Sequence, residues 1–102
     1  MKWTDGQKHS LHIETRRWFR RSAGNTYMTA AIHLDGARVV KIGPTGGYGD
    51  HGLTLAFDWL EENRYIEREH YANGGKEDGT RPLREDLGGT YSVVDVGRQG
   101  DL

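Results

Sequence analysis

Residues 11–42 read LHIETRRWFRRSAGNTYMTAAIHLDGARVVKI, and this stretch decides the fold. From residue 8 to residue 20, and again from residue 26 to residue 34, apolar or β-branched side chains alternate with polar ones. A period of two is typical of strands. Ser22-Ala23-Gly24-Asn25 between the two segments is a turn cluster. The stretch therefore predicts two strands joined by a short turn.

A third strand is predicted from residue 38 to residue 43, after the hairpin signal Asp35-Gly36. A strict two-residue turn places Lys41 beside Ala30, whereas a three-residue loop places Ile42 there. We favour the three-residue loop because it gives the hairpin one wholly apolar face, which a one-residue slip would destroy.

A helix is predicted after the glycine-rich junction 43–49, with Asp50 as its N-cap and an end near Asn63. Its apolar residues recur at i, i+3, i+4 and i+7, which is the spacing of a face packed on a core. They are Leu53, Ala56, Phe57 and Leu60.

The rest of the chain predicts a long loop over residues 72–90, with residues 84–87 as a candidate short turn of helix, and a last strand over residues 91–96. The order β-β-β-α-loop-β predicts an α+β fold, in which one helix packs on one face of an antiparallel sheet of three to four strands. With 102 residues the chain is one domain, and residues 1–7 and 97–102 are expected to be mobile. No apolar run approaches 18 residues, so no membrane span is predicted.

Charge divides the chain into two parts, although the formal net charge is only −1. Residues 1–43 carry a charge of +5 and residues 44–102 carry −6. This asymmetry indicates either a surface that binds a charged partner or an attraction between the two parts within the fold.

Arginine and aromatic side chains interleave on the first two predicted strands. Such a surface contacts phosphates and stacks on bases, or it fills a protein interface. In a third interpretation, Trp18 belongs to the core and the arginines extend over it. The candidate partner-binding residues of this basic face are Arg16, Trp18, Arg20, Arg21 and Tyr27. A second candidate surface is the acidic side of the predicted helix, with Asp58, Glu61 and Glu62.

No motif predicts catalysis. The absence of cysteine excludes a thiolate metal site, and the five histidines show no metal-ligand spacing. The junction 43–49 suits an anion bound at the start of a helix, but it matches neither the P-loop nor the dinucleotide-binding fingerprint. The negative charge of Asp50 also opposes the binding of an anion. His51 beside Asp50 is a weak acid–base candidate. We therefore expect no enzymatic activity, no metal and no cofactor.

Three stretches carry a resemblance to known proteins: WFRRSAGNTY at residues 18–27, GYGD at residues 47–50 and VVDVGR at residues 93–98. With them the chain resembles a family of short proteins encoded by phages and other mobile elements. Members share an aromatic and arginine-rich strand ending in a Gly-Asn-Thr-Tyr turn, a Gly-Tyr-Gly junction, a helix and a valine-rich last strand. The resemblance carries no established activity, but its context implies an accessory protein that acts on a host system.

Two functions are predicted on these grounds. The first is a non-enzymatic inhibitor of host defence, of the anti-CRISPR kind, that binds a host protein or nucleoprotein complex in the cytoplasm of an infected cell. The alternative is a DNA- or RNA-binding module that uses the basic aromatic face. A polar chain with three tryptophans and an exposed sheet edge also allows a homodimer.

Overall fold

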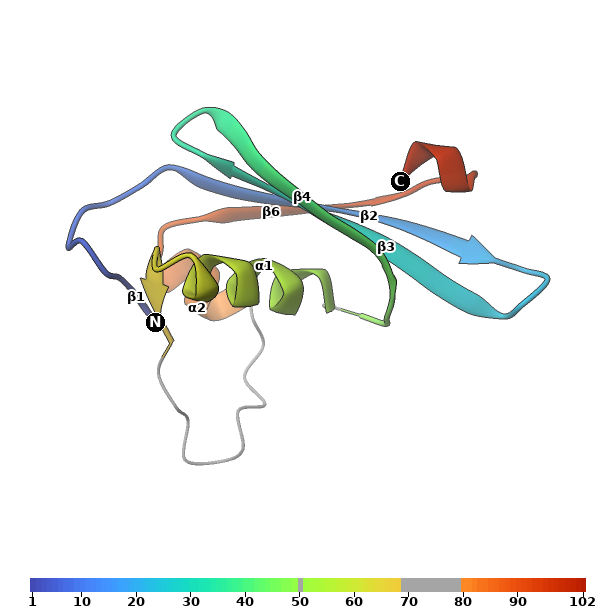
Figure 1. Ribbon diagram of the computed structural model, residues 1–102, viewed down its shortest axis with the longest axis horizontal. Helices are drawn as coiled ribbons and strands as arrows, with labels where there is room; N and C mark the ends of the chain where they lie inside the picture. Colours follow the sequence, from blue (N-terminus) through green and yellow to red (C-terminus); the bar gives the residue numbers. More distant parts are fainter. Residues whose placement is uncertain (50, 69–79) are drawn as a thin grey trace.

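The computed structural model describes residues 1–49, 51–68 and 80–102. A four-stranded sheet with the order β4-β3-β2-β6 forms its centre, and a two-stranded sheet pairs β1 with β5. Figure 1 shows the helices α1 and α2 on one side of the large sheet and the C-terminal turn η1 on the other. The predicted α+β class is confirmed. The elements are β1 (Lys2–Trp3), β2 (Leu11–Arg20), β3 (Asn25–Leu34), β4 (Ala37–Gly46), α1 (His51–Glu62), β5 (Ile66–Glu67), α2 (Thr80–Glu85), β6 (Thr90–Asp95) and η1 (Gln99–Asp101).

The two predicted strands pair as a hairpin, although β2 begins at Leu11 rather than at residue 8. The antiparallel register of the hairpin runs without a break from Leu11 opposite Leu34 to Arg20 opposite Asn25. Gly24 closes the turn with a positive φ of 66°, and its N–H donates to the carbonyl of Arg20 at 2.9 Å. Glycine suits this position because it adopts left-handed backbone angles without steric cost.

The β3–β4 pairing has the predicted alignment but a different turn. Ile42 lies opposite Ala30, which keeps the apolar face intact. The predicted three-residue loop is wrong, because Asp35 and Gly36 alone form the turn with φ of 51° and 86°. Two residues with positive φ make the turn that best matches strand twist. A β-bulge next to Ile32 then takes up the extra residue.

The last strand differs from the prediction in direction. β6 pairs with β2 in parallel, so the sheet is mixed rather than wholly antiparallel. After β4 the chain passes through α1, β5 and α2 beneath the sheet before it enters β6 at the end where β2 begins. A crossover of this kind returns the chain in the same direction, as parallel pairing requires.

Within the segment predicted as a loop over residues 72–90, the described part contains a short helix, which begins earlier than the candidate turn over residues 84–87. Residues 80–85 form α2 and Thr90 begins β6, whereas residues 72–79 lie outside the described part of the chain. Pro82 and Leu83 of α2 are buried. The charged residues of this short helix, Arg81, Arg84 and Glu85, are exposed.

The core lies between α1 and the sheet. The four apolar helix residues predicted to face it are all buried, whereas the predicted N-cap, Asp50, lies outside the described residues. Gly52 of α1 lies directly against Thr15 of β2, where a Cβ would meet the Thr15 side chain. The buried cluster is Met1, Trp3, Leu11, Ile13, Ile32, Leu34, Leu53, Ala56, Phe57, Leu60, Ile66, Leu83 and Leu87.

Both ends of the chain are packed where the sequence predicted mobile segments. Trp3 is only 7% exposed, because β1 pairs with β5 and the indole Nε1 donates to the carbonyl of Leu87 at 3.3 Å. At the other end Leu102 is buried, and the ammonium of Lys41 donates to its carbonyl at 2.6 Å. An apolar side chain at each end therefore anchors a segment that otherwise is polar.

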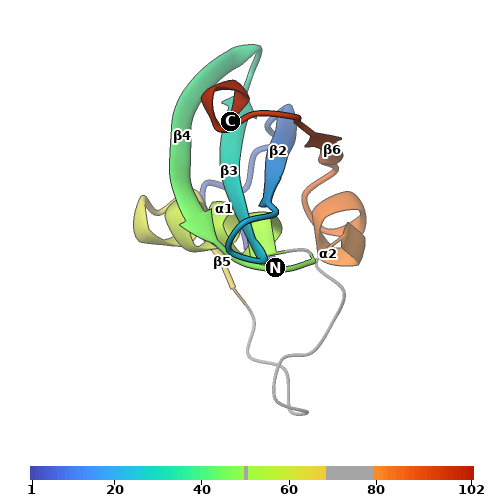
Figure 2. The same cartoon turned by 90° about the vertical axis from the view of Figure 1, so that its right-hand side faces the viewer.

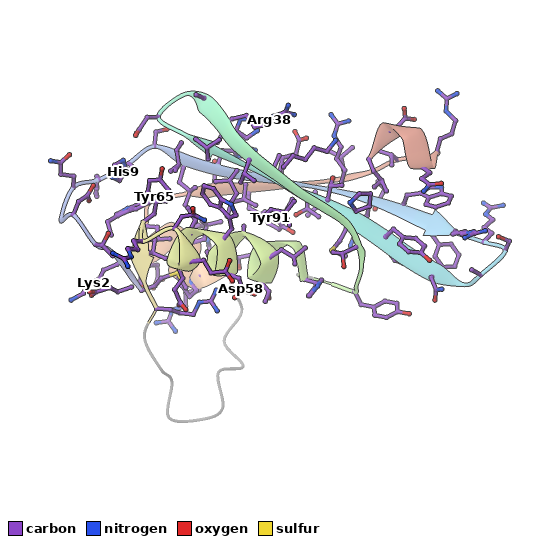
Figure 3. All side chains as sticks on the ribbon, viewed as in Figure 1. Lys2, His9, Arg38, Asp58, Tyr65 and Tyr91 are labelled. Atoms are coloured by element: carbon purple, nitrogen blue, oxygen red, sulfur yellow. The ribbon has the colours of Figure 1, made fainter. Side chains whose placement is uncertain are left out.

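His9 fastens the N-terminal segment to the β3–β4 turn, at the end of the sheet far from the β2–β3 turn (Figure 3). Its Nδ1 lies 2.9 Å from the carboxylate of Asp35, its Nε2 lies 2.7 Å from that of Asp5, and its ring packs on Trp3. The bonds to Asp35 and Asp5 raise the pKa of His9. His9 lowers the pKa of Asp35, whereas the backbone N–H of Gln7 is the main cause that lowers the pKa of Asp5. When it is protonated, the ring forms ion pairs with both carboxylates.

We expect the stability that His9 provides to depend on pH. A raised folded pKa gives a contribution that is complete below the ordinary value of 6.5 and is lost as the pH rises through the folded value. His9→Gln should therefore lower Tm more at about pH 5.5 than at about pH 9. Thermal unfolding of both proteins, followed by circular dichroism at each pH, measures this difference. An equal loss of Tm at the two pH values would show that the ion pairs contribute nothing.

Candidate binding site at the distal end of the sheet

The sheet is longer than the helix that covers it. The β2–β3 hairpin extends beyond the start of α1, and we call this part, with the junction 46–49, the distal end (Figure 1). On the helix side of the distal end, Phe19 is 55% exposed and Tyr48 is 74% exposed. Large aromatic side chains thus face solvent where α1 no longer covers the sheet.

An open groove of about 320 Å³ lies between these aromatic side chains. A second hollow of about 280 Å³ adjoins it. Thr26 and Tyr48 line both hollows, and we call the two together the aromatic groove. Its lining residues are Arg17, Phe19, Asn25, Thr26, Tyr27, Gly46, Gly47, Tyr48, Gly49 and Asp95.

Glycines at the junction hold Tyr48 in place at the groove. The N–H of Gly47 donates to the carbonyl of Thr26 at 3.2 Å, which ties the junction to β3. A Cβ on Gly47 would lie 2.8 Å from Cγ of His51, too close for a side chain unless the His51 ring moves. Gly49 has a positive φ of 57°, which glycine adopts without strain. Close packing thus explains glycine at residue 47, and the backbone conformation explains glycine at residue 49.

The three stretches that carry the family resemblance meet at this groove. Phe19 comes from residues 18–27, Tyr48 from residues 47–50 and Asp95 from residues 93–98. Sequence reasoning did not select these three side chains as site residues. The signal that could have found them was the presence of all three in the resembling stretches.

The arginines of the distal end are held by the chain's own acceptors. Arg17 makes two hydrogen bonds to the carboxylate of Asp95, at 2.9 and 3.2 Å. Arg16 donates to Glu14 at 3.0 Å and to the carbonyl of Asp101 at 2.9 Å. The Arg17–Asp95 pair joins the positive and negative parts of the chain, as one interpretation of the charge asymmetry predicted.

The predicted basic face exists on the side of the sheet away from α1. Trp18 lies opposite Tyr27, and their stacked rings have centroids 5.9 Å apart. Arg16 and Arg20 lie on the same face as Trp18 because side chains alternate along β2. Arg21 lies beyond the strand in the turn. Both rings are half-buried, which agrees only in part with the interpretation of Trp18 as core.

The predicted acidic face lies elsewhere, on α1. Figure 3 shows Asp58 well away from the β2–β3 turn. Arg68 neutralises much of this face, since its guanidinium lies 2.8 Å from the carboxylate of Asp58 and 3.4 Å from that of Glu61. Glu62 is exposed. The structure therefore does not bring the two candidate surfaces together.

Within residues 1–49, 51–68 and 80–102, no three His, Asp or Glu side chains are placed to hold a metal ion. No helix in the same ranges is long and apolar enough to cross a membrane. The pair of Asp50 and His51 falls partly outside the described residues.

The chain matches no protein-family model, no curated protein and no solved structure. The resemblance to phage-encoded proteins accordingly stays a prediction.

Proposed function

We propose that this protein is a non-enzymatic accessory protein of the phage type, which inhibits a host defence complex by docking its aromatic groove on a partner protein. The observation that carries the proposal is the exposure of Phe19 and Tyr48 at the groove where the three resembling stretches meet. Aromatic and arginine side chains are concentrated at protein interfaces and supply most of their binding energy.

The state of the arginines favours a protein partner over a nucleic acid. Binding to phosphates requires cationic side chains that are available to neutralise them. Arg16 and Arg17 are instead engaged by Glu14 and Asp95. A DNA- or RNA-binding role is the alternative, and it depends on Arg20, Arg21 and the Trp18 ring.

The proposal is tested in a bacterial host with an active CRISPR–Cas system. We expect expression of the native protein to raise the plating efficiency of a targeted phage, and the double variant Phe19→Ala, Tyr48→Ala to lose most of this effect. Truncation of a strong interface residue costs about 2 kcal/mol or more, which is about 30-fold in affinity. Val39→Ala is the matched control, because Val39 is an exposed apolar residue of β4 outside the groove. A double variant as active as the native protein would remove the groove from the proposal.

Two further measurements separate the alternatives. The native protein is titrated against labelled single- and double-stranded DNA and RNA at low and near-physiological salt. Binding that weakens steeply with salt, and that is lost in Arg20→Ala, Arg21→Ala, would establish the nucleic-acid alternative. Charge reversal at Glu61 and Glu62 should leave inhibition unchanged, and its loss would place the docking surface on α1.

A further inference from the structure

The large sheet has two edges, and they differ in how they are protected. β4 forms one edge, where Pro44 has no N–H to donate and Gly43 has a φ of 97°. A β-bulge distorts the same strand. Proline and bulges are among the devices by which proteins prevent pairing at a sheet edge. The β4 edge is therefore poorly suited to take another strand.

β6 forms the other edge and carries none of these devices. Its sequence, TYSVVD, contains β-branched and aromatic residues without lysine, proline or glycine. Figure 2 shows β6 on the outside of the sheet, with α2 beneath it rather than beside it. Val93 and Val94, whose side chains point to opposite faces, are each 40% exposed. This strand is an open, apolar edge.

The backbone of β6 directs hydrogen-bonding groups outward at every second residue. The N–H of Val96 donates to the carbonyl of Arg17 in β2 at 2.8 Å. Because these groups alternate in direction along a strand, Val94 also directs its groups to β2, whereas Val93 and Asp95 direct theirs away from the sheet. The backbone N–H and C=O of Val93 therefore point away from β2, toward the open side of the sheet.

We propose that β6 is a self-association surface, and that a second copy of this chain pairs with it antiparallel about a two-fold axis at Val93. In this register Val93 lies opposite Val93 of the second copy, as an outward-facing, hydrogen-bonded pair. Asp95 then lies opposite Tyr91 of the second copy and not opposite another Asp95, so no like charges face each other. The two sheets become one eight-stranded sheet, and the interface is self-complementary, as two-fold symmetry requires.

The second copy is favoured over an unrelated extended peptide by this self-complementarity. The strand places apolar against apolar at its centre, and its only charged side chain, Asp95, is already paired with Arg17. Pairing two edges also covers the exposed valines of both copies at once. The inference does not rest on the proposed function, although Asp95 of β6 also lines the aromatic groove.

Light scattering coupled to size-exclusion chromatography tests the assembly. We expect the native protein to elute with about twice its chain mass of 11.5 kDa at high micromolar concentration. Val93→Lys should elute as a monomer with an unchanged circular dichroism spectrum. Val39→Lys is the matched control on the other edge, since Val39 is 42% exposed, and it should remain a dimer. A monomeric native protein, or a dimer lost only in Val39→Lys, would overturn the proposal.

Cysteine cross-linking tests the register, because the native chain has no cysteine. In the proposed pairing the two Cα atoms of residue 93 are about 5.5 Å apart, within the range of about 4.4–6.8 Å that a disulfide needs. Oxidised Val93→Cys should therefore run as a covalent dimer on a non-reducing gel. Val94→Cys should remain monomeric, because its counterpart is displaced by two residues, about 6.8 Å along the strand. Cross-linking of Val94→Cys but not Val93→Cys would contradict this register.

Discussion

Trp3→Ala is expected to lower the free energy of unfolding by about 3–5 kcal/mol, the usual cost of truncating a buried tryptophan. The ring is only 7% exposed and packs on His9, and Nε1 donates to the carbonyl of Leu87. Its loss leaves a cavity where the N-terminal strand, α1 and the segment after α2 meet, and it leaves the buried carbonyl of Leu87 without this donor. For a domain of this size such a loss is a large part of the total stability.

Urea unfolding, followed by circular dichroism, measures the effect. Trp18→Ala is the matched control, because Trp18 is half-buried on the open face, where it stacks on Tyr27. We expect the control to lose clearly less stability than Trp3→Ala. If both variants unfolded at the same urea concentration as the native protein, the N-terminal strand would not be part of the core, and residues 1–7 would be mobile as the sequence alone predicted.

The elements that the sequence predicted correctly are those in which each residue contributes to a local period. The alternation in β2 and β3 and the helical spacing of α1 are properties of neighbouring residues, so they are visible without the fold. The alignment of Ile42 with Ala30 was also predictable, because only one register gives an apolar face. The turn itself was not, because a two-residue turn with a bulge gives the same alignment as a longer loop.

The features that the sequence did not reveal depend on distant segments. Alternation over residues 91–96 indicates a strand but contains no information about its direction or its neighbour, and β6 is in fact parallel to β2. Trp3 stands among polar residues, and only the pairing of β1 with β5 explains its burial. A single apolar residue has no period, so its role is decided entirely by tertiary contacts.

Features of the candidate binding site also depend on contacts between distant segments, which the sequence does not reveal. The alternating pattern placed arginine and aromatic residues on the first two strands. It could not show that Arg17 forms hydrogen bonds with Asp95, 78 residues further along the chain. Nor could it show that α1 begins too late to cover Phe19, which left Phe19 and Tyr48 exposed. Whether a charged side chain is available to a partner depends on its neighbours in space.

Gly52→Val is expected to lower the free energy of unfolding by about 3 kcal/mol, at the upper end of what overpacking a core costs. A Cβ at Gly52 would lie 2.8 Å from Cγ2 and 3.1 Å from Cβ of Thr15, so α1 must move away from β2. Replacing glycine inside a helix improves helix propensity, but by less than about 1 kcal/mol. Steric repulsion therefore outweighs the gain, and urea unfolding of the variant measures the net loss. Gly97→Val is the control, because a Cβ at Gly97 meets no heavy atom of the described residues within 4 Å.

A second substitution tests whether this contact is the cause. Thr15→Ala removes the two Thr15 atoms closest to the new side chain, and the Thr15 hydroxyl has no hydrogen-bond partner among the described residues that would be lost with it. The double variant Thr15→Ala, Gly52→Val should therefore lose less free energy of unfolding than the two single variants together, by about 1–2 kcal/mol. Such a difference is expected for residues in direct contact. Strict additivity would mean that the helix does not press on β2 at Thr15, and that the cost of valine at residue 52 arises within α1 itself.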